Sequence, residues 1–293
     1  MIDIKPSDIP LPQLHQYILG GVAPRPIAFA STVDEEGRPN LSPYSFYNAF
    51  GVNPTTLVFS PSRRGRDNTT KHTYDNVKKV PEVVINAVNW DIVEQMSLSS
   101  TEYPEGTNEF VKAGLTMQKS DMVRPFRVKE SPVQFECKVR EIIETGSEGG
   151  AGNLVICEIL IMHIDEGILD EGGRIDPYKA KLVGRLAANY YTKAFGDAIF
   201  EVEKPLAKLG IGVDGLPEEI RNSTVLTGND LGKLGNTEAL PSQGELKEFG
   251  EQKWVKEWFE SNRDDVSVRH KKARELLDAG MVSDALKFLL SGK

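Results

Sequence analysis

The stretch Val133-Gln-Phe-Glu-Cys-Lys-Val-Arg-Glu-Ile-Ile143 decides the fold class, because apolar and polar side chains alternate along it. Its apolar side chains are Val133, Phe135, Cys137 and Val139, and the polar ones between them are Gln134, Glu136, Lys138 and Arg140. Successive side chains of a β-strand point to opposite faces, so we expect one face in a core and the other in water. A second long strand is predicted over residues 154–164.

Shorter elements are predicted around these two strands. Further strands are expected over residues 27–33, 40–47, 56–60 and 83–88, the first two forming a hairpin, and short helices over residues 11–19, 69–79 and 91–99. This order lacks the regular strand–helix alternation of a doubly wound fold. We therefore predict a mainly β protein, an antiparallel barrel decorated by helices, because closure of a sheet removes its exposed edges.

Length and charge limit the function classes. The 293 residues suit one large domain or one domain with an appendage. The net charge of −8 opposes non-specific binding to nucleic acid or to an anionic membrane, so we expect neither as a partner.

Cysteine usage and the N-terminus indicate the compartment. The two cysteines cannot build a disulfide framework, and neither has a partner at zinc-ligand spacing, so we predict no metal site. No signal peptide or long apolar run is recognisable, and we expect a cytoplasmic protein.

The composition changes near Phe200, where we place a domain boundary. Residues 1–200 carry the strands, and residues 201–293 form a C-terminal extension. Its first half is rich in Gly, Pro, Asn and Thr, which predicts a loop-like strap. Its end predicts two helices turned at Gly280, a helical hairpin with Trp254 and Trp258 in its core rather than in a ligand cage.

The segment Ser60-Pro-Ser-Arg-Arg-Gly-Arg-Asp-Asn-Thr-Thr-Lys-His-Thr-Tyr-Asp-Asn76 leaves a strand, crosses a basic loop and enters a helix. Its cations are Arg63, Arg64, Arg66 and Lys71, opposed before Asp75 only by Asp67. Amide N–H groups, hydroxyls and cations that meet at one point suit a phosphate. Taken alone, a solvated arginine-rich loop explains this segment about as well.

The segment Asn40-Leu-Ser-Pro-Tyr-Ser-Phe-Tyr-Asn48 interleaves aromatic rings with small polar groups. A flat heteroaromatic ligand needs apolar contact on its faces and hydrogen bonds at its edge, which this composition offers. Taken alone, an ordinary strand with aromatic core residues explains it better.

Several motifs in order resemble the flavin reductase-like, FMN-binding split-barrel family, in its flavoredoxin branch. The opening Ala23-Pro-Arg-Pro-Ile-Ala-Phe-Ala-Ser-Thr32 and the segment 37–48 look like the family's first strands. Val58-Phe-Ser60 followed by Lys71-His-Thr-Tyr-Asp-Asn-Val77 is similar to its phosphate segment, with His72 where Asp is usual. Further matches at residues 104–110, 131–133 and 181–186 extend the resemblance over about two-thirds of the chain.

The resemblance implies a six-stranded Greek-key split barrel that forms a homodimer and binds FMN near the subunit interface. By this resemblance the phosphate would be surrounded by Ser60, Lys71, His72, Thr73 and Asn76, and the isoalloxazine and ribityl chain would meet Tyr44, Ser45, Phe46 and Asn48. A cationic His72 beside a phosphate would be favourable. Arg185 is a further lining residue, although Ala187-Ala188 stand where the family more often has paired glycines.

Two other residues, His163 and Cys157, carry side chains that could take part in chemistry. His163 falls where some related reductases carry a histidine near the flavin, which makes it a candidate catalytic or nicotinamide contact beside the alternative of a structural histidine. Cys157 is in phase with apolar neighbours and indicates core packing. We assign no role to either cysteine.

The resemblance implies an FMN-dependent oxidoreductase of the flavin reductase type. It would pass a hydride from NADH or NADPH to flavin, and then reduce free flavin, oxygen or a redox partner protein. No Gly-x-Gly-x-x-Gly fingerprint is present, so nicotinamide would bind transiently over the flavin. The alternatives are an FMN-binding electron-transfer or partner module without significant NAD(P)H turnover, and the related barrel that oxidises pyridoxamine phosphate.

Overall fold

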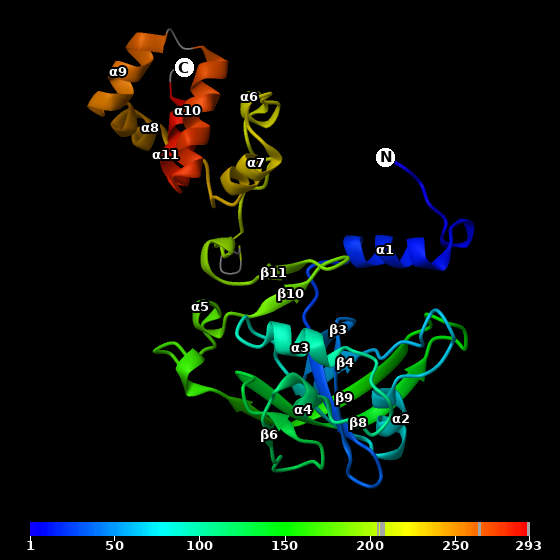
Figure 1. Ribbon diagram of the computed structural model, residues 1–293. Coiled ribbons are helices and arrows are strands. Elements are labelled where there is room, and N and C mark those ends of the chain that lie inside the picture. Colours follow the sequence, from blue (N-terminus) through cyan, green and yellow to red (C-terminus); the bar gives the residue numbers. More distant parts are fainter. Residues whose placement is uncertain (204, 206–208, 263–264, 292–293) are drawn as a thin grey trace. The chain divides into compact units, whose positions relative to one another are not determined.

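The computed structural model describes residues 1–203, 205, 209–262 and 265–291 of the chain. It divides into two compact units, Met1–Phe200 and Glu201–Lys293, which we call the N-terminal and C-terminal units (Figure 1). Among the described residues, no helix is both long and apolar enough to cross a membrane.

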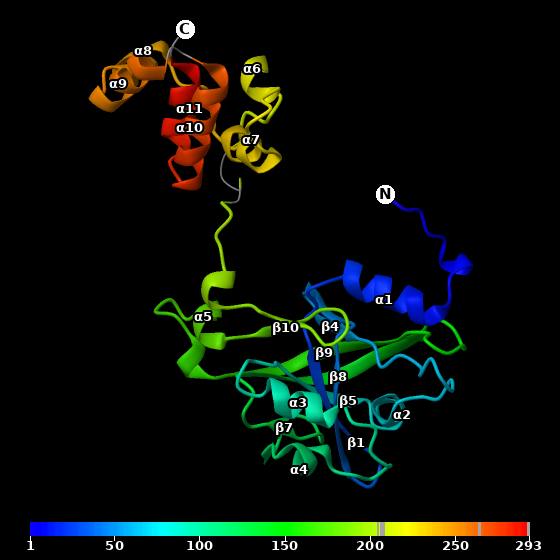
Figure 2. The ribbon, with the colours of Figure 1, turned by 45° about the horizontal axis from the view of Figure 1, so that its top comes forward.

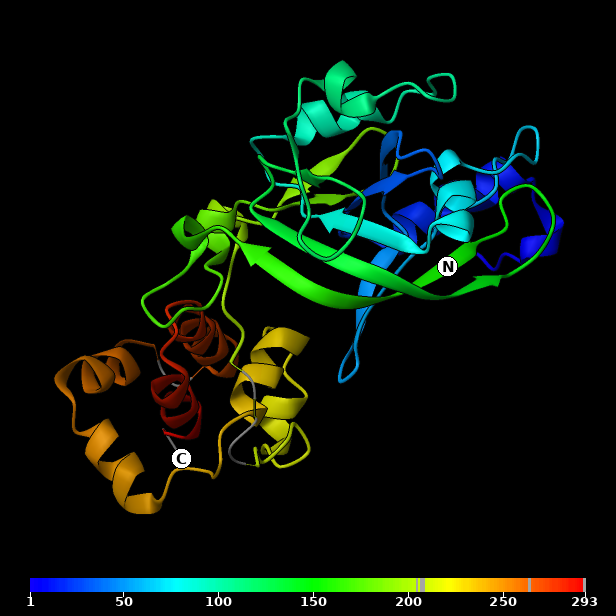
Figure 3. The same ribbon diagram turned by 90° about the horizontal axis from the view of Figure 1, so that it is seen from below.

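The N-terminal unit is built on a seven-stranded antiparallel sheet. In spatial order its strands are β2 (Pro39–Tyr44), β1 (Ala28–Val33), β5 (Glu82–Asn86), β8 (Val133–Glu144), β9 (Asn153–Ile164), β4 (Thr55–Phe59) and β3 (Tyr47–Val52). The expected first hairpin is present, with Ala28 opposite Tyr44. The long strands β8 and β9 are the two green ribbons that run side by side through the unit in Figure 3.

The sheet differs from the expected six-stranded barrel in strand number and closure. Residues 40–47, expected as one strand, belong to two, because the chain bends at Ser45 and Phe46 between β2 and β3. These strands lie at opposite edges of the sheet. Tyr44 at the end of β2 and Tyr47 at the start of β3 are nevertheless only three residues apart, a length of chain that spans at most about 11 Å. The sheet therefore curls until its edges approach at this bend, but no ladder of the described strands joins β2 to β3.

Smaller elements surround the sheet. They are α1 (Leu11–Gly21), α2 (His72–Lys79), α3 (Val93–Ser99), α4 (Glu109–Ala113), α5 (Pro177–Ala180), β6 (Met117–Gln118), β7 (Arg127–Val128), β10 (Val183–Arg185), β11 (Tyr191–Lys193) and the 3-10 turns η1 (Pro6–Asp8), η2 (Glu166–Ile168) and η3 (Gly196–Ala198). The first three helices agree with the expected positions. Helix α1 has no buried residue within the described chain.

Two hydrophobic cores bury strand β1 on both faces. One core joins Phe29 of the sheet to Met96 of α3 and Phe110 of α4, two helices that Figure 2 shows on one side of the strands. The other core, on the opposite face of β1, contains both cysteines, Cys137 and Cys157, which are free and fully buried. The expected core packing of Cys157 is confirmed.

The expectation that one face of β8 is wet is wrong for its first half. Lys138 and Arg140 are exposed, but Gln134 and Glu136 are buried. The Gln134 amide donates to the carbonyls of Val128 and Ser131, and the Glu136 carboxylate accepts backbone amides of the loop before β7. Polar side chains are buried here because the loop between β6 and β7 covers them, which alternation along one strand does not reveal.

The C-terminal unit is a helical domain with its own core rather than a strap followed by a hairpin. Its helices are α6 (Glu218–Arg221), α7 (Gly228–Gly235), α8 (Gln243–Gly250), α9 (Lys253–Asn262), α10 (Val266–Asp278) and α11 (Val282–Leu290). Helix α7 lies inside the expected strap. A capping box between Thr227 and Asp230 starts it, while its three glycines hide the helical pattern in the sequence.

The expected hairpin at the end of the chain is present as α10 and α11, which turn at Gly280 with a φ of +77°. Trp254 and Trp258 pack in this unit's core, where their ring centroids lie 5.7 Å and 4.7 Å from that of Phe288. The core interpretation of these tryptophans is confirmed.

Candidate functional site

The basic and aromatic segments of the sequence meet at one edge of the sheet. Strand β3 pairs with β4 so that Tyr47 lies opposite Phe59, and the Ser60 amide donates to the Phe46 carbonyl at 2.9 Å. The bend at Ser45 and Phe46 therefore lies beside the point where the basic loop begins. Antiparallel pairing places the two predicted parts of a flavin site next to each other.

Arg63 fixes the shape of the basic loop. Its Nε and Nη2 atoms each donate at 2.7 Å to Asn68, whose φ of +58° is a left-handed conformation that Asn tolerates better than most residues. The Arg63 amide also donates to the Ala151 carbonyl in the turn between β8 and β9. Its guanidinium is thus committed to the loop itself.

The other three loop cations, Arg64, Arg66 and Lys71, which we call the cation cluster, converge on Glu102. Arg64 Nε lies 3.1 Å and Lys71 Nζ 3.5 Å from Glu102 Oε1, and Arg66 pairs with Oε2. Hydrogen bonds from Arg66 and Arg64 hold the pKa of Glu102 below its usual value, although partial burial opposes them. Sequence reasoning missed Glu102 because it comes from the distant α3–α4 loop.

Thr73 faces the protein interior. Its hydroxyl oxygen accepts the Asn40 amide at 2.8 Å and the Tyr44 hydroxyl at 2.9 Å, and the residue is fully buried. Burial raises the pKa of Tyr44 to about 12. These contacts place Thr73 and the Tyr44 hydroxyl in a bracing network between β2 and α2 rather than beside the cation cluster.

His72 and Asn76 line a small hollow of about 90 Å³ that also includes the carboxylates of Asp75 and Glu109. The Asn76 amide donates to the Thr32 hydroxyl at 3.1 Å. The structure therefore does not bring His72 and Asn76 to the cation cluster with Lys71, and the acidic lining disfavours a phosphate in this hollow.

The remaining predicted residues near the bend have their own contacts. The Ser45 hydroxyl accepts a hydrogen bond from Arg25 Nε at 3.3 Å, and the Ser60 hydroxyl accepts one from the Asn153 backbone amide at 3.0 Å. Phe46 is 37% exposed, with its ring edge-on to His15, and Asn48 is exposed on β3. Phe46 and Asn48 are thus the predicted aromatic and amide groups that remain accessible to a ligand.

Arg185 lies at the end of β10, paired through backbone hydrogen bonds with Arg25. Its guanidinium stacks 4.5 Å from the Tyr191 ring centroid and donates to the Ala188 carbonyl. Ala188 has a φ of +49°, a conformation that favours glycine. An alanine thus stands at a position whose backbone conformation suits glycine better.

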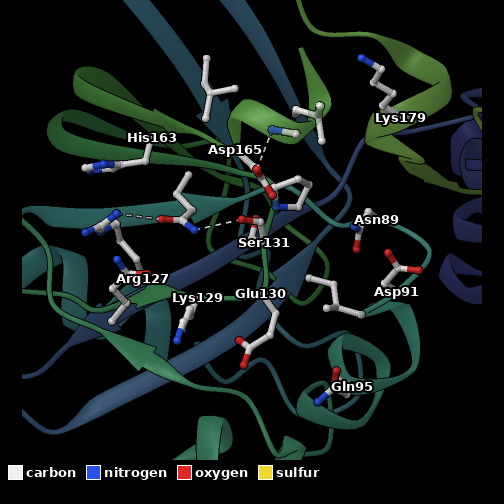
Figure 4. Close-up of a pocket in the computed structure, with 17 residues that line it drawn as sticks. Asn89, Asp91, Gln95, Arg127, Lys129, Glu130, Ser131, His163, Asp165 and Lys179 are labelled. Carbon is white, nitrogen blue, oxygen red and sulfur yellow. Dashed lines mark hydrogen bonds between the residues drawn. The ribbon is translucent and has the colours of Figure 1, made fainter. Parts of the chain in front are cut away.

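His163 belongs to a separate polar cavity of about 630 Å³ (Figure 4). None of the other predicted site residues lines it. Its wall includes Arg127, which donates to Gln134 at 3.1 Å, and Asn89, whose buried Oδ1 atom has no hydrogen-bond partner in the described structure. His163 Nε2 lies 2.8 Å from Glu136 Oε1. These contacts favour the structural interpretation of His163.

Asp121, Glu136 and His163 each offer a ligand atom within 4.8 Å of the others, as a metal site requires. The Glu136 carboxylate, however, already accepts amides of Asp121 and Met122 and lies 3.6 Å from Arg127. Burial raises the pKa of Glu136, but these amides and His163 outweigh it, so the net shift is downward. An ion-pair network accounts for this cluster without a metal.

Comparison with known proteins finds a family match for the N-terminal unit. Residues 20–196 match the family model of the flavin reductase like domain. An uncharacterized protein of Aquifex aeolicus is 38% identical over 189 residues, which are 64% of this chain and 94% of that protein.

Solved structures show the same fold. Nitrilotriacetate monooxygenase component B from Bacillus cereus superposes with a TM-score of 0.64 at 28% identity, covering 69% of this chain and 98% of that one. The 2-nitrobenzoate 2-nitroreductase NbaA of Pseudomonas fluorescens superposes with a TM-score of 0.61 at 27% identity, covering 71% of this chain and 100% of that one. A Shewanella frigidimarina protein with a split barrel domain superposes with a TM-score of 0.58 at 23% identity, covering 70% of this chain and 100% of that one. At this identity the similarity shows the fold alone.

Proposed function

Because the chain belongs to the flavin reductase like domain family, we propose that it is an FMN-binding oxidoreductase driven by NADH or NADPH. The observation that carries the FMN assignment is the cation cluster, which lies on a loop that begins beside the exposed Phe46. Bound FMN would supply the redox chemistry, accepting a hydride and passing electrons to free flavin, oxygen or a partner protein.

The chain's own residues would bind and orient the cofactor. Arg64, Arg66 and Lys71 offer guanidinium and ammonium donors to the phosphate, and charge-assisted hydrogen bonds of this kind are the stronger ones. Phe46 offers apolar contact and Asn48 an amide to the ring system and ribityl chain. Thr73, Tyr44 and Asn40 hold α2 against β2 and contribute to stability rather than to phosphate contact.

No acid, base or nucleophile among the predicted residues is required by this proposal. Positioning of two redox groups face to face is itself the main contribution expected of the protein. Because the sequence has no dinucleotide fingerprint, the nicotinamide would be held transiently above the flavin.

The second candidate is an FMN-binding electron-transfer module without significant NAD(P)H turnover. The observation that favours it is the C-terminal unit, a compact helical domain with its own core and no predicted flavin residue, which suits docking of another protein. The similar solved structures include a monooxygenase component and a nitroreductase, so we propose the acceptor only as a class.

We also propose a homodimer, because apolar side chains lie open on two neighbouring parts of the N-terminal unit. Phe50 and Val52 on the edge strand β3 are 69% and 91% exposed, and α1 exposes Leu11, Tyr17 and Ile18. An edge strand with exposed apolar residues is a surface that proteins ordinarily cover. A second copy of the chain would cover it next to the proposed flavin site.

Spectroscopy tests the proposed function directly. The purified protein is searched for flavin absorption, the extracted cofactor is identified, and apoprotein is titrated with FMN and riboflavin. Stopped-flow mixing of the FMN-loaded protein with NADH and NADPH under anaerobic conditions then follows flavin bleaching. Rapid bleaching supports the reductase, bleaching only by a reduced protein or chemical donor supports the electron-transfer module, and absence of FMN binding contradicts both.

A further inference from the structure

Three positive side chains surround one carboxylate in the N-terminal unit. Arg64 and Lys71 lie 3.1 Å and 3.5 Å from one oxygen of Glu102, and Arg66 pairs with its other oxygen. Asp67 is a second acidic neighbour, 3.1 Å from Arg66 Nε. Because Asp67 is also bound by Thr69, Glu102 is the acceptor that the three cations share.

The geometry around Glu102 suits a larger anion than a carboxylate. A carboxylate offers two oxygens and one negative charge, whereas a phosphate monoester offers three oxygens and nearly two charges at neutral pH. Burial and the charge of Arg64 lower the pKa of Lys71, and Glu102 opposes this shift. The cation cluster therefore needs an anion, and Glu102 supplies only part of the charge that a phosphate would bring.

Glu102 is held in a way that allows it to leave. Its side chain is 39% exposed, and residue 102 lies in irregular chain between α3 and α4. In the described part of the structure, the Glu102 side chain pairs with Arg64, Arg66 and Lys71. Ion pairs at the rim of the solvent, as these are through Glu102, are weak, so a phosphate can replace them.

We infer that the Glu102 carboxylate occupies the phosphate position of the cation cluster in the flavin-free protein and is displaced when FMN binds. The inference rests on the proposed function and deepens it. Glu102 then lowers the preference for phosphorylated over non-phosphorylated flavin, because the FMN phosphate must displace this internal anion and riboflavin, which has no phosphate, need not. Free inorganic phosphate competes for the same position.

The test compares Glu102→Gln with Glu105→Gln in the full chain. Glu105 is exposed in the same loop, carries the same charge and forms no ion pair in the described part of the structure, so it controls for general loss of negative charge. Each protein is titrated at constant ionic strength with FMN, riboflavin and inorganic phosphate. We expect E102Q to tighten FMN and phosphate about fivefold to tenfold and to leave riboflavin unchanged, with E105Q near wild type.

Three results would overturn the inference: E102Q binds FMN and phosphate no tighter, E102Q binds them more weakly because Glu102 organises the cations, or E105Q has an equal effect. Failure of the proposed function looks different. A wild type that binds no FMN, together with tighter phosphate binding by E102Q, would refute the flavin assignment and keep Glu102 as the occupant of an anion site.

Discussion

Lys71 and Thr73 are two residues apart at the start of α2, yet their side chains have different surroundings. The Lys71 ammonium joins the cation cluster, and the Thr73 hydroxyl is enclosed by Asn40 and Tyr44. A residue-by-residue resemblance assigned both to the phosphate. The structure separates a group that can contact a ligand from one that holds the helix.

Substitutions separate these two tasks. We expect Lys71→Ala to weaken FMN binding about tenfold or more, because one charge-assisted bond is lost, with little change in stability. We expect Thr73→Val to lower the free energy of unfolding by about 1–3 kcal/mol, since two buried donors lose their acceptor, with little change in FMN affinity. FMN titration and thermal unfolding measure both effects.

Lys79→Ala, at the other end of α2, is the matched control. If Thr73→Val lowered FMN affinity more than Lys71→Ala did, the proposed separation of the two roles would be contradicted.

His270 carries a pH dependence in the C-terminal unit, whose only histidine it is. The Ser223 oxygen accepts amides of Val225 and Leu226, which leaves its O–H to donate to His270 Nδ1 at 2.7 Å. Burial, with the charge of Arg269, lowers the pKa of His270 from 6.5. The folded unit therefore favours the neutral ring.

The unfolded chain binds a proton at His270 more readily than the folded one, so stability present above pH 6.5 is lost as the pH falls below it. We expect thermal unfolding of the full chain to shift downward between pH 7.5 and pH 5.5. The shift should be smaller in His270→Gln. Equal pH dependence in the two proteins would assign the effect elsewhere.

At the scale of elements, the local sequence pattern predicted most strands and helices correctly, but it predicted less well which of their side chains are buried. The β1–β2 hairpin, the long strands and the α10–α11 hairpin follow from alternation, helical spacing and turn residues. The bend at Ser45 and Phe46, the cover over Glu136 and the approach of Glu102 to the basic loop depend on segments distant in sequence. Helix α7 was missed because its glycines weaken the helical signal.

Strand β3 carries the prediction for assembly. Phe50 and Val52 are exposed along an unpaired edge, so charged side chains there should oppose covering by a second copy. We expect Phe50→Lys combined with Val52→Lys to convert a dimer of the 32.4 kDa chain to a monomer in light scattering. Val111→Lys, exposed on α4, is the control. A wild type that is monomeric while loaded with FMN would refute the dimer.

At the scale of the whole molecule, the two units have separate cores, and the predicted flavin residues all belong to the first. We expect residues 1–200 alone to fold and to bind FMN within about threefold of the full chain, since the removed part contributes no predicted contact. FMN titration and thermal unfolding of this fragment test the division. A folded fragment that binds no FMN would show that the C-terminal unit helps to build the site.

The two buried thiols allow opening of the N-terminal unit to be measured by thiol labelling. Burial raises the pKa of both Cys137 and Cys157 well above the usual value, so neither is reactive while β8 and β9 stay packed. The C-terminal unit has no cysteine, and alkylation by a thiol reagent therefore counts openings of the sheet alone. If FMN binding stabilises the closed unit, the labelling rate should fall when FMN is present. The ratio of the two rates would measure this stabilisation without an introduced probe.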